Sequence, residues 1–200
     1  MMNIDATAIV DLRDARIVLP GGAGLVGQNL VARLRAKGCA NIVVLDKHRA
    51  NLEVLKQVQP EVEAVYADLS QPGPWTRYIQ DADIVVMLQA QIGGNDYQEF
   101  VRNNVDSTRL ILDAIKAGNS PYLVHISSSV VNSVATDDYT DTKKQQEAMV
   151  VASGLRHCVL RVHQMPTIHC LPIEQILPAV PPKSWPMRAQ LLQDRWNRWS

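Results

Sequence analysis

The sequence predicts an α/β fold built on one doubly wound parallel sheet of about six strands. Short apolar runs rich in Val and Ile recur along the chain, and each is too short for a core helix, as in strands buried on both faces. Longer segments with apolar residues at helical spacing separate these runs. Repeated strand–helix units form parallel sheets that helices cover on both faces, with right-handed crossovers.

The expected strands follow one another from the first glycine-rich loop to the end of this region. They cover residues 17–19, 42–45, 62–66, 84–88, 122–126 and 158–162. Apolar residues from Leu25 to Leu34 recur at helical spacing, and those from Val101 to Ile115 predict a second, longer helix. Lys37-Gly38 and Ala117-Gly118 indicate the helix ends.

Composition and charge exclude several classes of protein. Lys plus Arg and Asp plus Glu number 20 each, so the formal net charge is zero and no dominant nucleic-acid surface is expected. The longest apolar runs, such as residues 84–88, are far below the roughly 20 residues that span a bilayer, so no membrane partner is expected. No secretory pattern is visible at the start, and the three cysteines lack metal-ligand spacing. We therefore expect a cytoplasmic domain with reduced thiols and no metal.

The glycine-rich segment after the first strand predicts a phosphate-binding loop. Gly21, Gly24 and Gly27 form a GxxGxxG pattern, with Leu25 and Val26 between the last two. Glycine lets the backbone turn tightly and approach a ligand, and the following helix N-terminus offers unpaired N–H groups to a phosphate. A glycine-rich strand–helix turn without a ligand is the alternative.

Two carboxylates at strand ends predict the contacts of an adenosine. Asp46 ends the second strand, where a carboxylate accepts hydrogen bonds from ribose hydroxyls and repels a 2′-phosphate, which favours NAD over NADP. Lys47 and Arg49 follow it and weaken that discrimination. Asp68-Leu69 ends the third strand, where the pair is placed to hold an adenine ring. Strand-end or turn residues exposed to solvent are the alternative reading for both carboxylates.

Tyr139 and Lys143 are the candidates for acid–base chemistry. Residues four apart on a helix share one face, and a tyrosine with a pKa near 10 needs about 4 kcal/mol of phenolate stabilisation to act as a base at pH 7. A neighbouring ammonium supplies such stabilisation. Residues 127–129 are serines at the end of the fifth strand, where ligands of doubly wound sheets bind. A surface tyrosine beside a solvated lysine is the alternative.

Taken together, these motifs resemble the extended branch of the short-chain dehydrogenase/reductase superfamily, the NAD-dependent epimerases and dehydratases. The resemblance runs from about Arg16 to Val162. It rests on these segments: Gly21 to Gly27, Asp46, Asp68-Leu69, Asn104 to Thr108, Ile126 to Ser129, and Tyr139 with Lys143.

The resemblance implies a Rossmann sheet, an NAD cofactor, transient hydride transfer and, in many members, nucleotide-linked sugars as substrates. Tyr139 would be the general acid/base and Lys143 would bind the nicotinamide ribose and lower the Tyr139 pKa. Ser128 would bond the reacting oxygen, with Ser127 and Ser129 as register alternatives. The remaining cofactor contacts that it implies are Leu88, Gln89, Ala90, Gln91 and Asn104. Extended relatives commonly dimerise through helices that correspond to those around Asn104 and Gln145, although core packing alone would explain the same apolar stripes.

The sequence also departs from the family pattern. Tyr139 lies only eleven positions after Ser128, and Arg161-Val162-His163 stands where the family usually has Arg-Pro. Residues 166–200 hold six of the eleven prolines and three of the four tryptophans, and they do not resemble the longer substrate domain of the family. We therefore expect an NAD-binding domain over residues 1–165 and a C-terminal segment over 166–200, a truncated remnant or a replacement of the substrate domain, with a short helix after Trp185. Two alternatives stay open: a non-catalytic NAD(P)-binding module or redox sensor, and an NAD(P)-dependent ketoreductase.

Overall fold

A computed structural model describes residues 12–162 and confirms the predicted fold class. Six parallel strands form one sheet in the order β3-β2-β1-β4-β5-β6. The strands are β1 (Ile17–Pro20), β2 (Ile42–Asp46), β3 (Glu63–Tyr66), β4 (Ile84–Met87), β5 (Tyr122–Ser128) and β6 (His157–Val162). This is the doubly wound order, in which the direction of winding reverses between β1 and β4.

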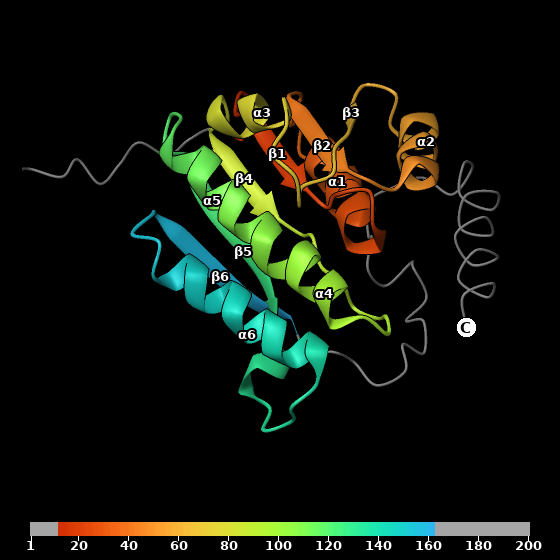
Figure 1. Ribbon diagram of the computed structural model, residues 1–200. Coiled ribbons are helices and arrows are strands. Elements are labelled where there is room, and N and C mark those ends of the chain that lie inside the picture. Colours follow the sequence, from red (N-terminus) through yellow and green to blue (C-terminus); the bar gives the residue numbers. More distant parts are fainter. Residues whose placement is uncertain (1–11, 163–200) are drawn as a thin grey trace, which may run out of the picture. The chain divides into compact units, whose positions relative to one another are not determined.

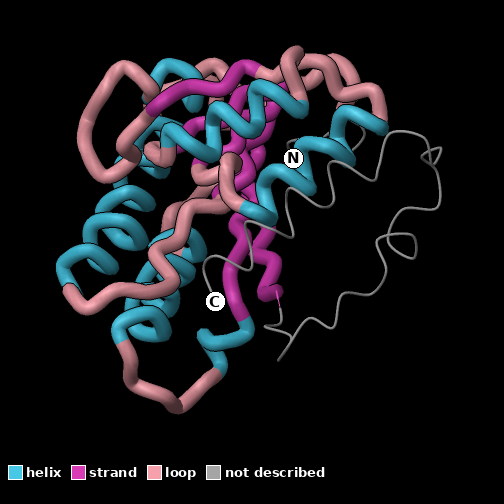
Figure 2. The backbone as a smooth tube through the Cα atoms, turned by 90° about the vertical axis from the view of Figure 1, so that its right-hand side faces the viewer, coloured by secondary structure: helices cyan, strands magenta, loops and turns pink. Residues whose placement is uncertain are grey.

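Helices lie on both faces of the sheet (Figures 1 and 2). They are α1 (Leu25–Ala36), α2 (Arg49–Val58), α3 (Thr76–Gln80), α4 (Tyr97–Phe100), α5 (Ser107–Lys116) and α6 (Asp138–Val151), with a π-helical turn η1 (Val101–Asp106) and a 3-10 turn η2 (Ser129–Asn132). One apolar cluster joins the sheet to α1 and α2, and a second joins it to α3, α5 and α6.

The central strands form because both of their faces are apolar. All residues of β1 and β2 are buried, and alternate side chains enter the two clusters: Val18 and Val43 on the α5 side, Leu19 and Val44 on the α1 side. Burial of one Val or Leu side chain contributes roughly 1.5–3 kcal/mol, so a continuous apolar run fixes a strand at the centre of a sheet.

The segment predicted as one long helix from Val101 to Ile115 is two elements. Residues 101–106 form the π-helical turn, and α5 begins at Ser107. Inserted turns of this kind are common at functional sites. Here the buried Asn104 side chain bonds both the N–H (2.6 Å) and the carbonyl oxygen (3.1 Å) of Gln91, which ties this turn to the loop after β4.

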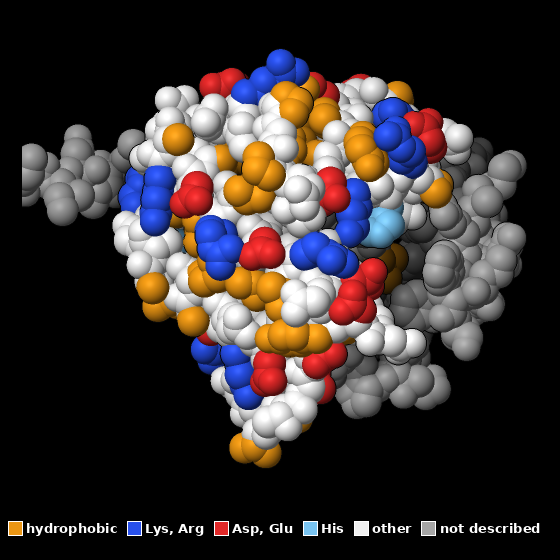
Figure 3. Space-filling view, viewed as in Figure 1, with side chains coloured by type: hydrophobic (Ala, Val, Ile, Leu, Met, Phe, Trp, Pro, Cys, Tyr) orange, Lys and Arg blue, Asp and Glu red, His pale blue; other side chains and the backbone are white. Residues whose placement is uncertain are grey.

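In the described part of the chain no helix is long and apolar enough to cross a membrane. Basic and acidic side chains alternate over the face seen in Figure 3, as the balanced charge count leads one to expect. The predicted boundary near residue 165 and the predicted helix after Trp185 lie outside the described residues.

Candidate active site

The loop between β1 and α1 has the geometry expected of a phosphate-binding loop. Gly21 has a φ of 76°, and a Cβ there would collide with the backbone of Gln89. A Cβ on Gly27 would collide with the backbone of Gly22. Gly24 caps α1 without any side-chain hydrogen bond, and no acidic residue lies in the first helical turn. The N–H groups of this turn are therefore left for an anion.

A hollow of about 210 Å³ lies in front of this loop, at the carboxyl ends of β1, β2, β3 and β4. Nine of the predicted cofactor residues line it: Gly21, Gly24, Asp46, Asp68, Leu69, Leu88, Gln89, Ala90 and Gln91. Leu25 and Val26 do not line it, and their side chains are half exposed at the start of α1. Gly27 lies behind the loop, where it lets α1 pack closely.

Asp46 is nearly buried and lines the hollow at the end of β2. Its Oδ2 accepts a hydrogen bond from the Ala23 N–H (3.1 Å), and its Oδ1 accepts one from the His48 N–H (2.9 Å). The His48 ring nitrogen Nδ1 lies 2.9 Å from the same Oδ1. The carboxylate is thereby fixed between the glycine loop and the start of α2, at a position that lines the hollow.

Asp68 lines the same hollow just after the end of β3. Its burial favours the neutral acid, but hydrogen bonds from the Ser70 hydroxyl and N–H, together with the charges of Lys47 and Arg102, lower the pKa of its carboxyl below the usual value. Asp68 is therefore an anion at neutral pH, available as a hydrogen-bond acceptor.

The opposite wall of the hollow is a chain of polar side chains that composition and spacing did not predict. Lys47 donates to Asn103 Oδ1 (2.7 Å), and Asn103 Nδ2 donates to Gln91 Oε1 (3.0 Å). Asn103 lines the hollow, whereas the predicted Asn104 lies behind it, fully buried, and holds the Gln91 backbone. The spacing of Asn103 and Ser107, four apart on one helical face and both lining the hollow, is the signal that would have found this wall.

Strand alternation separates the three candidate serines. Ser127 points toward α6, where its hydroxyl donates to Glu147 Oε2 (2.5 Å). Ser128 is the last residue of β5, and its Oγ accepts a hydrogen bond from the Val130 N–H (3.3 Å). Ser129 begins the 3-10 turn. Ser128 is thus the serine at the carboxyl edge of the sheet whose hydroxyl is not taken up by a carboxylate.

Tyr139 and Lys143 lie one turn apart on α6, beside α5, β5 and β6 (Figure 1). Tyr139 is half-buried, and within residues 12–162 its phenol has no hydrogen-bond partner. Lys143 is almost fully buried, and its ammonium donates to the Ile126 carbonyl (3.3 Å), two residues before Ser128. Burial lowers the pKa of Lys143 to about 8, so the side chain still carries its proton at pH 7.

The face of α6 around Lys143 carries a group of charged and polar side chains whose hydrogen bonds the sequence did not predict. Glu147 accepts hydrogen bonds from Ser127 and from Arg161 Nη2 (2.5 Å), and Arg161 Nη1 also donates to Asn132 (3.0 Å). These bonds, chiefly those from Arg161, lower the pKa of Glu147 against the opposing effect of its burial. The group joins α6 to the ends of β5 and β6.

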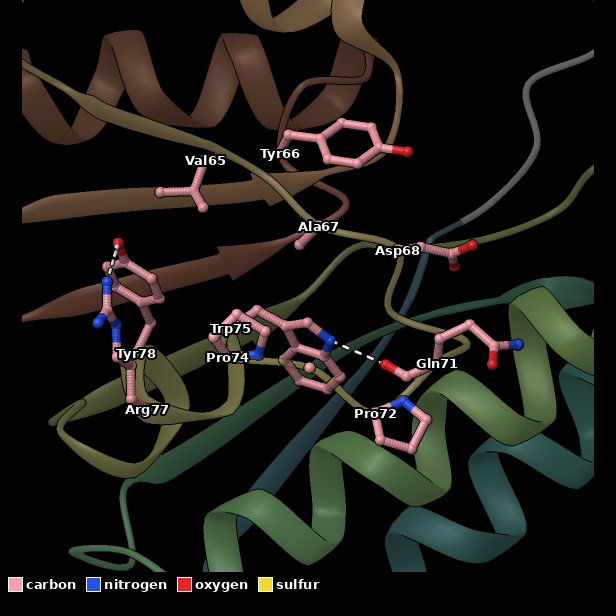
Figure 4. A pocket seen from close by; sticks show the side chains of 11 residues that line it. Val65, Tyr66, Ala67, Asp68, Gln71, Pro72, Pro74, Trp75, Arg77 and Tyr78 are labelled. Atoms are coloured by element: carbon pink, nitrogen blue, oxygen red, sulfur yellow. Dashed lines mark hydrogen bonds between the residues drawn. The ribbon is translucent and has the colours of Figure 1, made fainter.

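A larger hollow of about 370 Å³ lies between the end of β3 and the start of α3 (Figure 4). Aromatic side chains and prolines form much of its wall, and the Trp75 indole N–H is already taken by the Gln71 carbonyl (3.0 Å). It shares Ala67 and Asp68 with the first hollow but lacks the glycine loop. Its lining therefore offers no comparable phosphate site.

Residues 12–162 contain no cluster of three or more His, Cys, Asp or Glu side chains arranged to hold a metal ion.

A family model described as the NAD dependent epimerase/dehydratase family matches residues 17–150. A search of curated proteins found no match.

Solved structures with the same fold include UDP-glucuronic acid 4-epimerase from Bacillus cereus in complex with NAD, at 23% identity and a TM-score of 0.64, over 74% of this chain and 56% of that chain. The Bordetella bronchiseptica enzyme WbmF, in complex with NAD+ and UDP, is 20% identical with a TM-score of 0.63, over 76% of this chain and 49% of that one. A short-chain dehydrogenase/reductase superfamily protein from Agrobacterium tumefaciens with bound NAD is 23% identical with a TM-score of 0.63, over 72% and 48%. The chain spans about half the length of these structures.

Proposed function

Because the chain belongs to the NAD dependent epimerase/dehydratase family and its cofactor is NAD, we propose that it is an oxidoreductase of the epimerase/dehydratase type acting on a nucleotide-linked sugar. The observation that carries this proposal is that two groups of predicted site residues lie on one sheet. Gly21, Gly24 and Asp46 line the hollow at the carboxyl ends of β1 and β2, and Ser128 ends β5, which packs against the helix α6 that carries Tyr139 and Lys143.

The residues present fit NAD. The cradle at Gly21 has no room for a Cβ, no side chain caps the first turn of α1, and Asp46 lines the hollow one strand away. These features match a pyrophosphate beside an adenosine ribose with free 2′- and 3′-hydroxyls. When bound, NAD supplies a hydride acceptor, or a donor once it is reduced.

The side chains on α6 and β5 supply the proton chemistry. We assign Tyr139 as the general acid/base because its phenol is free within the described residues and its helix also carries Lys143. Lys143 lies one turn from Tyr139 on the same helix and is charged at pH 7, and we assign it to the nicotinamide ribose. Ser128 bonds the substrate oxygen that gains or loses the proton, whereas Ser127 is committed to Glu147.

The substrate class rests on two similar proteins. One is named as a UDP-glucuronic acid 4-epimerase, and the other was crystallised with UDP. We carry this class over to the present chain as a proposal. Helices α5 and α6 are also the proposed interface of a homodimer, and light scattering on the purified chain tests it.

Turnover of nucleotide sugars tests the proposed function. The full chain, loaded with NAD, is incubated with UDP-linked and dTDP-linked hexoses and hexuronic acids, and epimers or dehydration products are separated by chromatography. Tyr139→Phe removes only the phenolic oxygen, so we expect a fall of roughly 10²- to 10⁴-fold in rate with NADH affinity unchanged.

Equal rates in Tyr139→Phe and the wild type would refute the assigned acid/base. NAD binding without turnover on any nucleotide sugar would favour the binding-module alternative, and net consumption of NADH with a ketone substrate would favour the ketoreductase.

A further inference from the structure

The buried ammonium of Lys143 is held by an amide. Its Nζ donates to Gln146 Oε1 at 2.5 Å and to the Ile126 carbonyl at 3.3 Å. Gln146 is fully buried. The carboxylate on the same face, Glu147, is occupied by Ser127 and Arg161. Within residues 12–162 no carboxylate is hydrogen-bonded to the Lys143 ammonium, whose two hydrogen-bond partners are both neutral oxygens.

The orientation of the Gln146 amide is determined by its partners. Gln146 Nε2 donates to Thr108 Oγ1 (2.9 Å), and the Thr108 hydroxyl donates to the Asn104 carbonyl (2.6 Å). Because the Thr108 proton is used on Asn104, Thr108 can only accept from Gln146. A flipped amide would place its NH₂ group against the ammonium, so the amide oxygen must face Lys143.

This chain of hydrogen bonds connects Lys143 to the wall of the NAD site. Thr108 lies in the first turn of α5, directly after the π-helical turn. Gln146 Nε2 also lies 3.5 Å from the Gln89 carbonyl, and Gln89 both lines the hollow and abuts Gly21. Neutral groups of Gln146, Thr108 and Gln89 therefore connect the Lys143 side chain to the glycine loop.

We propose that Gln146 is a positioning residue that fixes the Lys143 ammonium with a neutral dipole, so that the lysine charge remains available to the Tyr139 phenol and the nicotinamide ribose. This proposal rests on the proposed function for the part that Tyr139 and Lys143 play. A glutamate at this position would form a buried ion pair with Lys143 and cancel the charge locally, whereas an apolar residue would leave the ammonium with the Ile126 carbonyl alone.

Direct titration of Lys143 tests this inference without any substrate. The full chain is labelled with ¹³C-lysine, with and without NAD, and the Cε resonance that disappears in Lys143→Arg is followed from pH 6 to 11. Burial lowers the pKa of Lys143 to about 8 in the wild type. We expect Gln146→Glu to raise the midpoint by roughly 1–3 pH units, the effect of an adjacent opposite charge.

The isosteric Gln146→Met should lower the same midpoint because the charged form loses its acceptor. Thr108→Val frees the amide to flip and should also lower it, which provides a second variant should Gln146→Met fail to fold. The matched control is Gln145→Met, the same substitution on the preceding, exposed residue, and it should leave the midpoint in place.

Kinetics then separate positioning from packing. With a turned-over substrate, Gln146→Met should lower kcat by roughly 10- to 100-fold, the cost of a misplaced catalytic group. Its pH–rate profile should move in the same direction as the titration. A Lys143 midpoint that is the same in the wild type, Gln146→Glu and Gln146→Met would overturn the inference. A midpoint that moves while the wild type turns over nothing would support the positioning of Lys143 and reject the proposed function instead.

Discussion

Acid should destabilise this fold through one buried side chain, His125 of β5. His125 is 1% exposed, and both of its ring nitrogens lack hydrogen-bond partners within the described residues. Lys143 and Glu147 face it from α6, and His157 faces it from β6. Burial, together with the positive charge of Lys143, lowers the pKa of His125 from 6.5 to about 3, so the folded protein holds this ring neutral.

The sign and size of the effect follow from this difference. Since the unfolded chain takes up a proton near pH 6.5 and the folded chain does so only near pH 3, stability is full above pH 6.5 and is lost as the pH falls toward 3. At 1.36 kcal/mol per pH unit, moving from pH 7 to pH 5 costs about 2 kcal/mol. That is a large share of the 5–15 kcal/mol by which domains are typically stable.

Urea unfolding at pH 7 and pH 5, followed by tryptophan fluorescence, measures this loss. His125→Leu replaces the ring with an apolar side chain of similar size, so the difference between the two pH values should shrink by about 2 kcal/mol. At pH 7 the variant should be as stable as the wild type or more stable, because it no longer buries unpaired polar atoms. An unchanged pH dependence in His125→Leu would contradict this explanation.

Two further predictions concern the NAD site. Gly21→Ala should weaken NADH binding roughly tenfold or more, because its φ of 76° is strained for alanine and the new Cβ meets the Gln89 backbone. Gly93→Ala, where a Cβ meets nothing within 4 Å, should bind NADH like the wild type in the same fluorescence titration. Asp46→Ser should narrow the preference for NADH over NADPH by roughly tenfold, since the carboxylate no longer repels a 2′-phosphate. Equal dissociation-constant ratios in Asp46→Ser and the wild type would exclude that role for Asp46.

The fold could be predicted because the sheet is buried on both faces. Each predicted strand lies within two residues of the observed one, since runs such as residues 42–45 fit only a central strand. The π-helical turn was missed because its cause is not local: Asn104 turns to the backbone of Gln91, thirteen positions away in the sequence. The spacing of apolar residues from Val101 to Ile115 cannot predict that contact, because Gln91 lies outside this segment.

The site was predicted in part, and the missing part has a physical explanation. Glycines and strand-end carboxylates can be identified from the sequence because few other roles require them at those spacings, and most of them line the hollow. Polar residues on the buried face of a helix cannot be identified in this way. The inward face of α6 carries Lys143, Gln146 and Glu147, which amphipathicity assigns to solvent.

The hydrogen-bond partners of these inward polar side chains lie partly on strands that are far from α6 in the sequence. The pairing determines which substitutions the site can accept. Glu147 is neutralised by Arg161 of β6, and Lys143 is left to Gln146 and to a carbonyl of β5. If the pairing were exchanged, so that Glu147 bonded Lys143 directly, the charge of the lysine would be neutralised and Arg161 would lose its partner. Strand β6 therefore contributes to the arrangement on α6, because its Arg161 occupies Glu147 while Lys143 bonds the neutral oxygens of Gln146 and Ile126.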